Sequence, residues 1–221
     1  MEGDIGKVVD FEENDRLFSF DFTASNTELS ADILGNTTLF SEWVDSKLLH
    51  QEARYGIGGY NEHRTIYSRS EHFNDLAEPR RLHLGTDIWG PAGTAVYAFS
   101  DATIHSFAFN DNFGDYGATI ILHHQIANHS FYVLYGHLSL SSLWGLEEGL
   151  PIAKGVKFAE FGNAEENGHW PPHLHFQVIN DMQGFKGDYP GVCQYSKRDQ
   201  YLENCPDPTF ILDNTFKTTS F

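Results

Sequence analysis

Between residues 95 and 179 the chain alternates short apolar runs, rich in β-branched and aromatic residues, with Gly, Pro, Asn and Asp. Such runs at close intervals are typical of strands in an antiparallel sandwich or barrel. The runs are residues 95–99, 102–109, 118–124, 131–138 and 174–179. We therefore predict a mainly β fold, with an antiparallel β-sandwich or barrel-like domain over residues 76–183.

The residues before this domain contain one pattern typical of a helix. Apolar side chains recur at helical spacing at Leu39, Phe40, Trp43, Val44 and Leu48. Asn36 or Thr37 can cap the first turn, so we predict an amphipathic helix that packs on the core. Three glycines within residues 56–60 are expected to interrupt regular structure there. We interpret residues 1–75 as an N-terminal extension and residues 184–221 as a loop-rich C-terminal wrap.

The charge balance argues against several kinds of partner. There are 14 Lys and Arg against 31 Asp and Glu, a net charge of −17, which repels phosphate backbones and disfavours nucleic acid as a partner. No apolar run approaches the roughly 18 residues of a membrane span, so we expect no membrane insertion. The N-terminus lacks the pattern of a secretory signal. This favours the cytoplasm, although an exported or cell-envelope protein whose signal had been removed would look the same. We expect a monomer.

The two cysteines, Cys193 and Cys205, lie close together near the C-terminus. Without a signal peptide such a pair is more often two reduced thiols than a disulfide. Their number and spacing do not suit a structural zinc cluster.

The chain contains 12 histidines, and some of their spacings are found in metal sites. By composition, about 0.6 His-x-His pairs and about 0.9 His-x3-Asp pairs are expected by chance. The context of each pair therefore matters more than its spacing.

His173 and His175 open an apolar strand, so both imidazoles project from the same face. His83 and Asp87 lie in a Gly- and Pro-rich stretch that can be a loop or a bulged strand. A His/Asp/His set leaves one position of a tetrahedral zinc ion open, as in catalytic sites. His137 follows a strongly apolar strand. The structural alternatives are histidines on an edge strand or its rim, and for Asp87 a turn-capping carboxylate.

The order of four motifs resembles one known family. The motifs are HLGTD, GATIILHH, YVLYGHLS and PPHLHFQV. Together with the Gly-rich turn GPAGTAVYAFSDATI, they look like the M23 peptidases, the lysostaphin and LytM-like zinc endopeptidases. The resemblance covers about residues 80 to 180. The loop before His-x-His, FGNAEENGHWPPHLH, is longer and bulkier than is usual in the family.

This resemblance implies one Zn²⁺ per chain, held by His83, Asp87 and His175, with His137 and His173 as catalytic histidines. The implied reaction is hydrolysis of a peptide bond in peptidoglycan-type or short Gly-containing peptides by a metal-activated water. Two alternatives stay open, which are a non-catalytic LytM-like binding or scaffolding module and a zinc hydrolase of a small cytosolic amide. An open groove would favour a polymer, whereas a pocket closed by the terminal segments would favour a small substrate or an inhibited state.

Other side chains are weaker candidates. His123 and His124 are adjacent on one strand, so at most one can face the site. The segments with His63, His72 and His169 can fold over the groove. Arg64 and Tyr67 can contact substrate, although solvated or packing roles are the commoner outcome for such residues.

Overall fold

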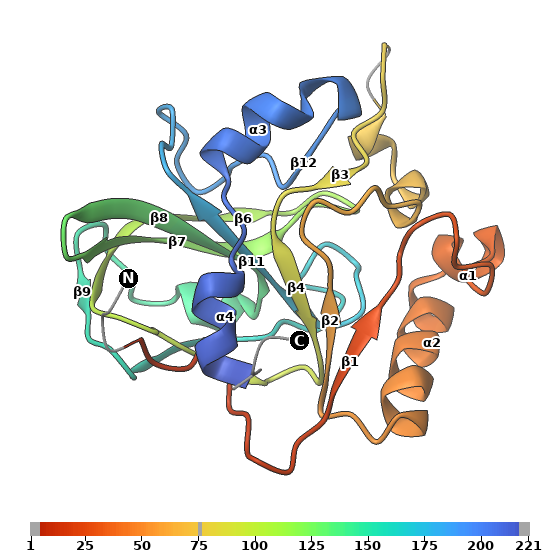
Figure 1. Ribbon diagram of the computed structural model, residues 1–221, viewed down its shortest axis with the longest axis horizontal. Helices are drawn as coiled ribbons and strands as arrows, with labels where there is room; N and C mark the ends of the chain where they lie inside the picture. The colour runs from red at the N-terminus through yellow and green to blue at the C-terminus, as the bar shows by residue number, and fades with distance from the viewer. Residues whose placement is uncertain (1–4, 75–76, 217–221) are drawn as a thin grey trace.

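The computed structural model describes residues 5–74 and 77–216, which are built around an eight-stranded sheet (Figure 1). In spatial order its strands are β1 (Leu17–Phe20), β2 (Tyr55–Gly58), β4 (Thr86–Trp89), β11 (His173–Ile179), β8 (His129–Leu138), β7 (Gly117–Ile126), β6 (Ala102–Asn110) and β9 (Pro151–Ile152). Only the β1–β2 pair in this sheet is parallel. The prediction of a mainly β fold is therefore confirmed.

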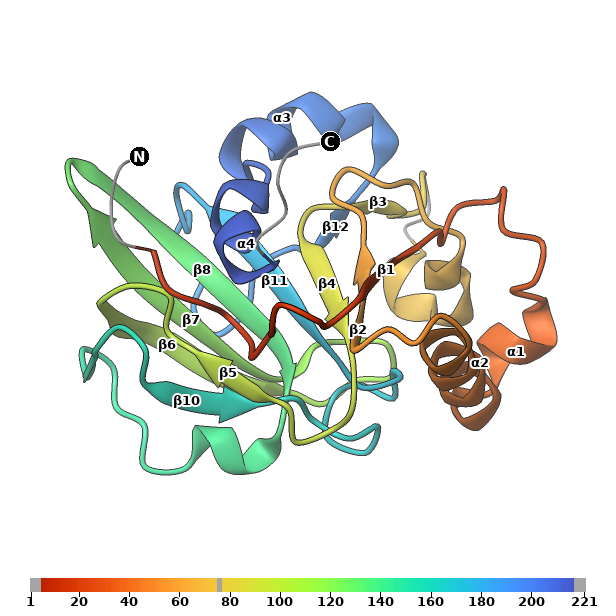
Figure 2. The same ribbon diagram turned by 60° about the horizontal axis from the view of Figure 1, so that its bottom comes forward.

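Two smaller sheets complete the β structure. They pair β5 (Ala95–Tyr97) with β10 (Lys157–Glu160), and β3 (Leu82–His83) with β12 (Val192–Cys193). The β5–β10 pair lies against one face of the long strands (Figure 2), where Val96 and Ala159 join the main buried core. The arrangement is thus sandwich-like, and the described strands do not close into a barrel.

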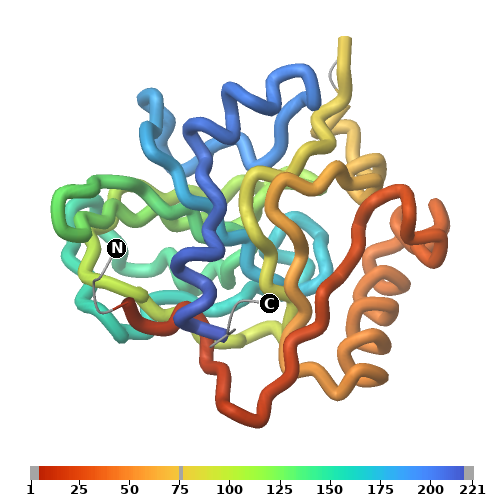
Figure 3. The backbone as a smooth tube through the Cα atoms, viewed as in Figure 1, coloured from red at the N-terminus to blue at the C-terminus, as the bar shows by residue number. Residues whose placement is uncertain are grey.

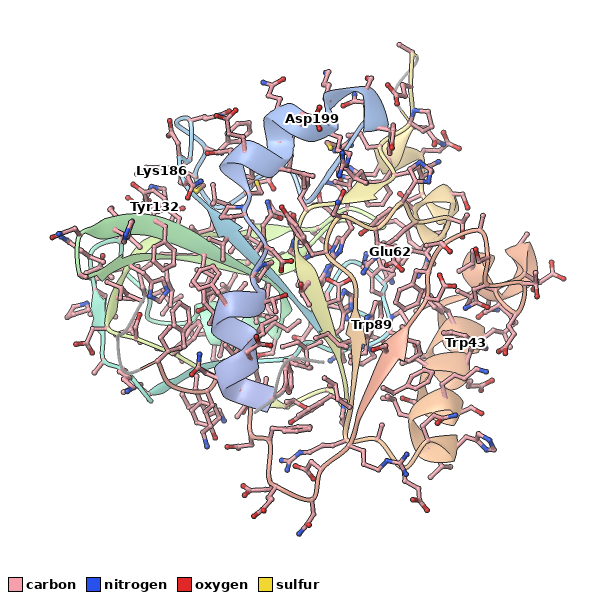
Figure 4. All side chains as sticks on the ribbon, viewed as in Figure 1. Trp43, Glu62, Trp89, Tyr132, Lys186 and Asp199 are labelled. Atoms are coloured by element: carbon pink, nitrogen blue, oxygen red, sulfur yellow. The ribbon has the colours of Figure 1, made fainter. Side chains whose placement is uncertain are left out.

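The predicted helix is present as α2 (Thr37–His50). Its N-cap is Asn36, whose side chain accepts hydrogen bonds from the amides of Thr38 and Leu39. A short helix, α1 (Ala31–Gly35), precedes it. The buried face of α2 packs in one cluster with Trp89, the last residue of β4, and Figure 4 shows Trp43 of this helix on the side of Trp89 away from the centre of the sheet. The helix therefore covers the edge of the sheet beside the candidate site.

The expectation that the glycines of residues 56–60 interrupt regular structure is wrong for Gly56 and Gly58, which lie in β2, whereas Gly59 directly follows the end of this strand. Their lack of a side chain is what this strand requires. A Cβ on Gly56 would lie 2.1 Å from the ring of Phe20, and one on Gly58 would lie 2.7 Å from Nη2 of Arg64. These glycines let large neighbouring side chains lie directly on the strand.

The C-terminal segment is loop-rich up to about residue 194 and then forms two helices that the sequence pattern did not indicate. These are α3 (Arg198–Asn204) and α4 (Thr209–Phe216). Helix α4 and the first described residues lie together over the sheet (Figure 3), and Thr215 Oγ1 accepts a hydrogen bond from the Val8 amide at 2.9 Å. Both cysteines are buried free thiols, as expected. Among the described residues, no helix has the length and apolarity to cross a membrane.

Candidate metal centre and active site

His83, Asp87 and His175 come from three strands and meet at one point. His83 ends β3, Asp87 lies in β4, and His175 lies directly opposite Asp87 in the neighbouring β11. His83 Nε2 is 3.0 Å from His175 Nδ1, and Asp87 Oδ1 lies 3.2 Å from the first and 3.0 Å from the second. All three residues are buried. Within the described residues, this is a group whose donor atoms are close enough to share one metal ion.

The hydrogen bonds around the two imidazoles show why this cluster suits a cation. His83 Nδ1 lies 2.9 Å from the carbonyl of Gly59, which can only accept, so this nitrogen carries the proton. His175 Nε2 lies 2.8 Å from Gln177 Oε1, whose amide nitrogen donates to the Pro190 carbonyl at 3.1 Å. In the neutral rings, His83 Nε2 and His175 Nδ1 therefore both direct lone pairs at the same carboxylate oxygen. A bound cation would satisfy all three acceptors at once.

The second oxygen of Asp87 is held by a fully buried arginine. Arg64 Nη1 donates to Asp87 Oδ2, and Arg64 Nε donates to Glu62 Oε2 at 2.6 Å. Burial alone would raise the pKa of Asp87, but His83 and Arg64 lower this pKa well below its ordinary value. The carboxylate therefore stays ionised, and only one of its oxygens faces the two histidines.

His137 and His173 lie beside this cluster with their rings 4.1 Å apart. His137 Nδ1 donates to the Asn167 carbonyl at 2.8 Å, and His173 Nδ1 donates to the Pro171 carbonyl at 2.7 Å. These bonds leave the Nε2 atom of each neutral ring with a free lone pair. Burial lowers the pKa of His173 to about 4 and that of His137 well below its ordinary value. Both rings are therefore neutral at pH 7, with an unprotonated Nε2.

The backbone at His137 is unusual. Its φ is 61°, in the left-handed region that residues other than glycine rarely adopt. The carbonyl of His137 also accepts a hydrogen bond from the Gly162 amide at 2.8 Å. Strained backbone of this kind is concentrated at functional sites, where the surrounding structure holds it in place.

Four of the five residues, Asp87, His137, His173 and His175, line a pocket of about 150 Å³, and His83 lies behind them. One wall comes from the N-terminal side, at Arg64, Ile66, Tyr67, His72, Phe73 and Arg80. The opposite wall comes from the C-terminal side, at Phe185, Asp188, Tyr189, Pro190, Gly191 and Val192. The site is thus a partly open pocket, flanked on two sides by segments from both ends of the chain.

The weaker candidates divide into residues at the pocket and residues away from it. Tyr67 and His72 line the pocket. His124 is buried elsewhere, with its Nδ1 2.8 Å from Ser100 Oγ, and His123 Nε2 lies 2.7 Å from Ser130 Oγ. His63 packs on Tyr195 and His169 stacks on Phe113, so neither of these histidines lines the pocket.

Sequence reasoning named Arg64 only as a possible substrate contact and missed the other residues that orient the cluster. Gly59 and Gln177 hold the two histidines through hydrogen bonds, Asn167 holds His137, and Arg64 holds Asp87. A signal existed only for Gln177, which follows His175 by two residues and so shares its face of β11. Gly59 and Arg64 are distant in sequence from the residues they contact.

Buried histidines make the metal-free protein sensitive to acid. Burial lowers the pKa of His83 to about 4, of His124 to about 3 and of His173 to about 4. The unfolded chain binds protons near pH 6.5 while these folded rings stay neutral, so stability is complete above pH 6.5 and is lost as pH falls toward 4. At pH 5.5 each ring costs about 1.4 kcal/mol, so the three lower the free energy of unfolding by about 4 kcal/mol.

Urea unfolding of chelator-treated protein at pH 7.5 and pH 5.5 measures this loss. The variant His124→Gln is the matched control, because it removes one of the three titrations away from the candidate metal centre. Between the two pH values it is expected to lose about 1.4 kcal/mol less of its free energy of unfolding than the unsubstituted protein does. Equal stability at both pH values would contradict the prediction.

The comparison with protein families agrees with this geometry. Residues 81–186 match the model of peptidase family M23. This part of the chain, just under half of its length, is therefore similar to the domain of that family. No curated protein is similar enough to the chain to be matched.

Several solved structures are similar to the chain. A zinc-containing peptidase from Vibrio cholerae is 28% identical over 44% of this chain and 27% of its own, with a TM-score of 0.35. Csd3 from Helicobacter pylori is 24% identical over 59% of this chain and 34% of its own, with a TM-score of 0.36. The lysostaphin catalytic domain from Staphylococcus simulans is 21% identical over 73% of this chain and 96% of its own, with a TM-score of 0.42. The chain thus spans about a third or less of the first two structures.

Proposed function

We propose that this protein is a zinc-dependent metallopeptidase that hydrolyses a peptide bond. The observation that carries the proposal is the convergence of two imidazole lone pairs and one carboxylate oxygen beside two further imidazoles with free Nε2 atoms. The M23 domain match supports the same reaction class. A non-catalytic scaffolding module would not need this buried arrangement to be complete.

His83 Nε2, Asp87 Oδ1 and His175 Nδ1 would hold the ion. When bound there, zinc supplies a Lewis acid that polarises a carbonyl and lowers the pKa of a water to roughly 7. Arg64 leaves Asp87 one oxygen for the metal, and Gly59 and Gln177 fix the tautomers of the two histidines. The orientation of all three ligands is therefore determined before metal binds.

His137 and His173 would move the protons. The Nε2 atom of either neutral ring can accept a proton from the attacking water and later pass it to the leaving amine. The Asn167 and Pro171 carbonyls, which accept from the two Nδ1 atoms, hold each ring in position and stabilise it when it is protonated. The stacking of Trp89 on His173, with centroids 3.9 Å apart, keeps water from one face of that ring.

Metal content tests the proposal. Protein purified without chelator is expected to contain one zinc per chain, and His175→Ala is expected to lose that zinc and all peptidase activity. The matched control is His123→Ala, which removes a histidine from a neighbouring strand outside the pocket and should keep both. Substoichiometric zinc that His175→Ala leaves unchanged would rule out the proposed function.

A further inference from the structure

The walls of the pocket come largely from residues outside the M23 domain. The N-terminal wall, which comes from residues 64–73 and Arg80, precedes the matched range of residues 81–186, and most of the C-terminal wall, residues 188–192, follows it. The walls are therefore additions of this chain to the M23 domain, and they decide what can reach the five histidine and aspartate side chains.

The N-terminal wall is anchored at the candidate metal centre. Arg64 has no exposed surface and joins Asp87 of the domain to Glu62 of the extension. Separating a buried ion pair leaves uncompensated charges and costs about 3–5 kcal/mol. Further along the wall, Ser70 Oγ donates to the Phe113 carbonyl at 2.6 Å. This wall is therefore fixed in place and does not behave as a displaceable inhibitory segment.

The C-terminal wall is fixed to the same strands. Val192 pairs with His83 in the small β3–β12 sheet, and the Leu84 amide donates to the Gly191 carbonyl at 2.9 Å. Tyr116 Oη donates to the Tyr189 carbonyl at 3.1 Å. A Cβ on Gly191 would lie 1.9 Å from Tyr116 Oη, so the backbone is packed directly on this ring. Neither wall can open without breaking several buried contacts.

The enclosed space is small. A volume of about 150 Å³ is below the roughly 300–1,000 Å³ of pockets that enclose drug-sized ligands. A cavity of about this size encloses a benzene-sized group. The enclosed part of a ligand is thus on the scale of a single amino-acid residue. The space between the two walls thus accommodates about one residue, which is less than a bulky cross-linked polymer needs on both sides of a cleaved bond.

Charged groups of both signs line the more exposed part of the pocket. Asp188 lines the pocket, and partial loss of hydration of its carboxyl group, together with the neighbouring Asp115, raises its pKa. His72 Nε2 lies 4.0 Å from Asp115 Oδ2, and Arg80 lines the same region. A small zwitterion would find counter-charges for both its ammonium and its carboxylate there.

We propose that the site takes short peptides of dipeptide scale and not a cross-linked polymer. This inference rests on the proposed function. In the reaction, water adds across one amide: the C–N bond breaks, a C–O bond forms, and the products are a carboxylate and an amine. Because both walls are fixed and the space between them holds about one residue, at least one product is about a single residue long.

The test uses the full zinc-loaded chain and a graded set of substrates. These are diglycine, alanylglycine, the same dipeptides blocked at both ends, pentaglycine and purified cross-linked peptidoglycan. We expect kcat/KM to fall at least tenfold from the free dipeptides to the blocked ones and to pentaglycine, with no release from peptidoglycan. Cleavage of peptidoglycan at a rate comparable to that of the dipeptides would overturn the inference.

Binding is measured separately from cleavage. Failure of the proposed peptidase activity can then be distinguished from failure of the proposed ligand class. Dipeptide binding is followed by the fluorescence of Trp89 and Trp170, which line the pocket, and polymer binding by co-sedimentation. If dipeptides bind without being cleaved, the proposed ligand class is supported and the proposed peptidase activity is contradicted. Co-sedimentation with peptidoglycan without dipeptide binding would overturn the ligand class, as would the absence of dipeptide binding at millimolar concentration.

A matched pair of variants tests the walls themselves. Phe185 lines the pocket with 41% of its surface exposed, and Phe109 is 39% exposed and lies outside it. Phe185→Ala is expected to reduce the preference for dipeptides over pentaglycine several-fold, whereas Phe109→Ala should leave it unchanged. An unchanged preference in Phe185→Ala, with the variant still folded, would count against a wall that selects by size.

Discussion

Replacing His137 or His173 by alanine is expected to lower kcat by a factor of about 10² to 10⁴ while one zinc stays bound, because such factors are typical for loss of a general acid or base. In both rings Nδ1 donates a hydrogen bond to a backbone carbonyl and Nε2 is free. Neither ring is among the proposed metal ligands. Steady-state hydrolysis of a dipeptide and atomic emission on the same sample measure the two quantities.

The control for these variants is His169→Ala, since His169 is exposed and lies outside the pocket. His137→Asn adds a second check, because asparagine tolerates a φ of 61° better than alanine does. It should be as inactive as His137→Ala and closer to the unsubstituted protein in stability. Loss of zinc in either alanine variant would show that the replaced histidine is a metal ligand. Full activity in both variants would show that neither histidine takes part in catalysis.

Arg64→Met is expected to lower the free energy of unfolding of the metal-free protein by about 3–5 kcal/mol. The substitution keeps much of the side-chain volume but leaves Asp87 and Glu62 without the cation that both contact. Arg64→Lys should recover only part of the loss, because a single ammonium cannot reproduce the forked geometry of the guanidinium. Urea unfolding in the presence of a chelator measures the free energy of unfolding of the unsubstituted protein and of the two variants.

Bound zinc should reduce the difference in free energy of unfolding between Arg64→Met and the unsubstituted protein, because a bound cation compensates the charge of Asp87. The matched control is Arg16→Met. Its pair with Glu52 is mostly exposed, at 61% and 82% of the two side chains, and such pairs contribute about 0–1 kcal/mol. If Arg64→Met destabilised the protein no more than Arg16→Met, the anchoring of the N-terminal wall would be refuted.

Some features of the fold were open to prediction because their cause is local. The apolar runs at 102–109, 118–124 and 131–138 have the composition of strands whatever they pair with, and they form β6, β7 and β8. The spacing of apolar residues after Asn36 likewise predicted α2. Alternation along a strand places His173 and His175 on one face, and this geometry holds before any tertiary contact forms.

The glycines of β2 show where local reasoning failed. Glycine weakens a strand in isolation, so residues 56–60 look like an interruption. In the folded protein the same glycines make room for Phe20 and for the Nη2 of Arg64. The packing of neighbours that are 36 and 6 residues away reverses the local preference.

The sequence by itself therefore determined the β-rich character of the domain and the helix α2, and its resemblance to the M23 peptidases supplied the candidate set His83, Asp87, His175, His137 and His173. Only the tertiary structure decided that Arg64 holds Asp87, that Gly59 sets the tautomer of His83, and that two terminal segments flank the pocket. Periodicity reports which face a side chain takes along its own strand or helix. It carries no information about which distant segment comes to lie on that face, and here those segments determine the size of the site.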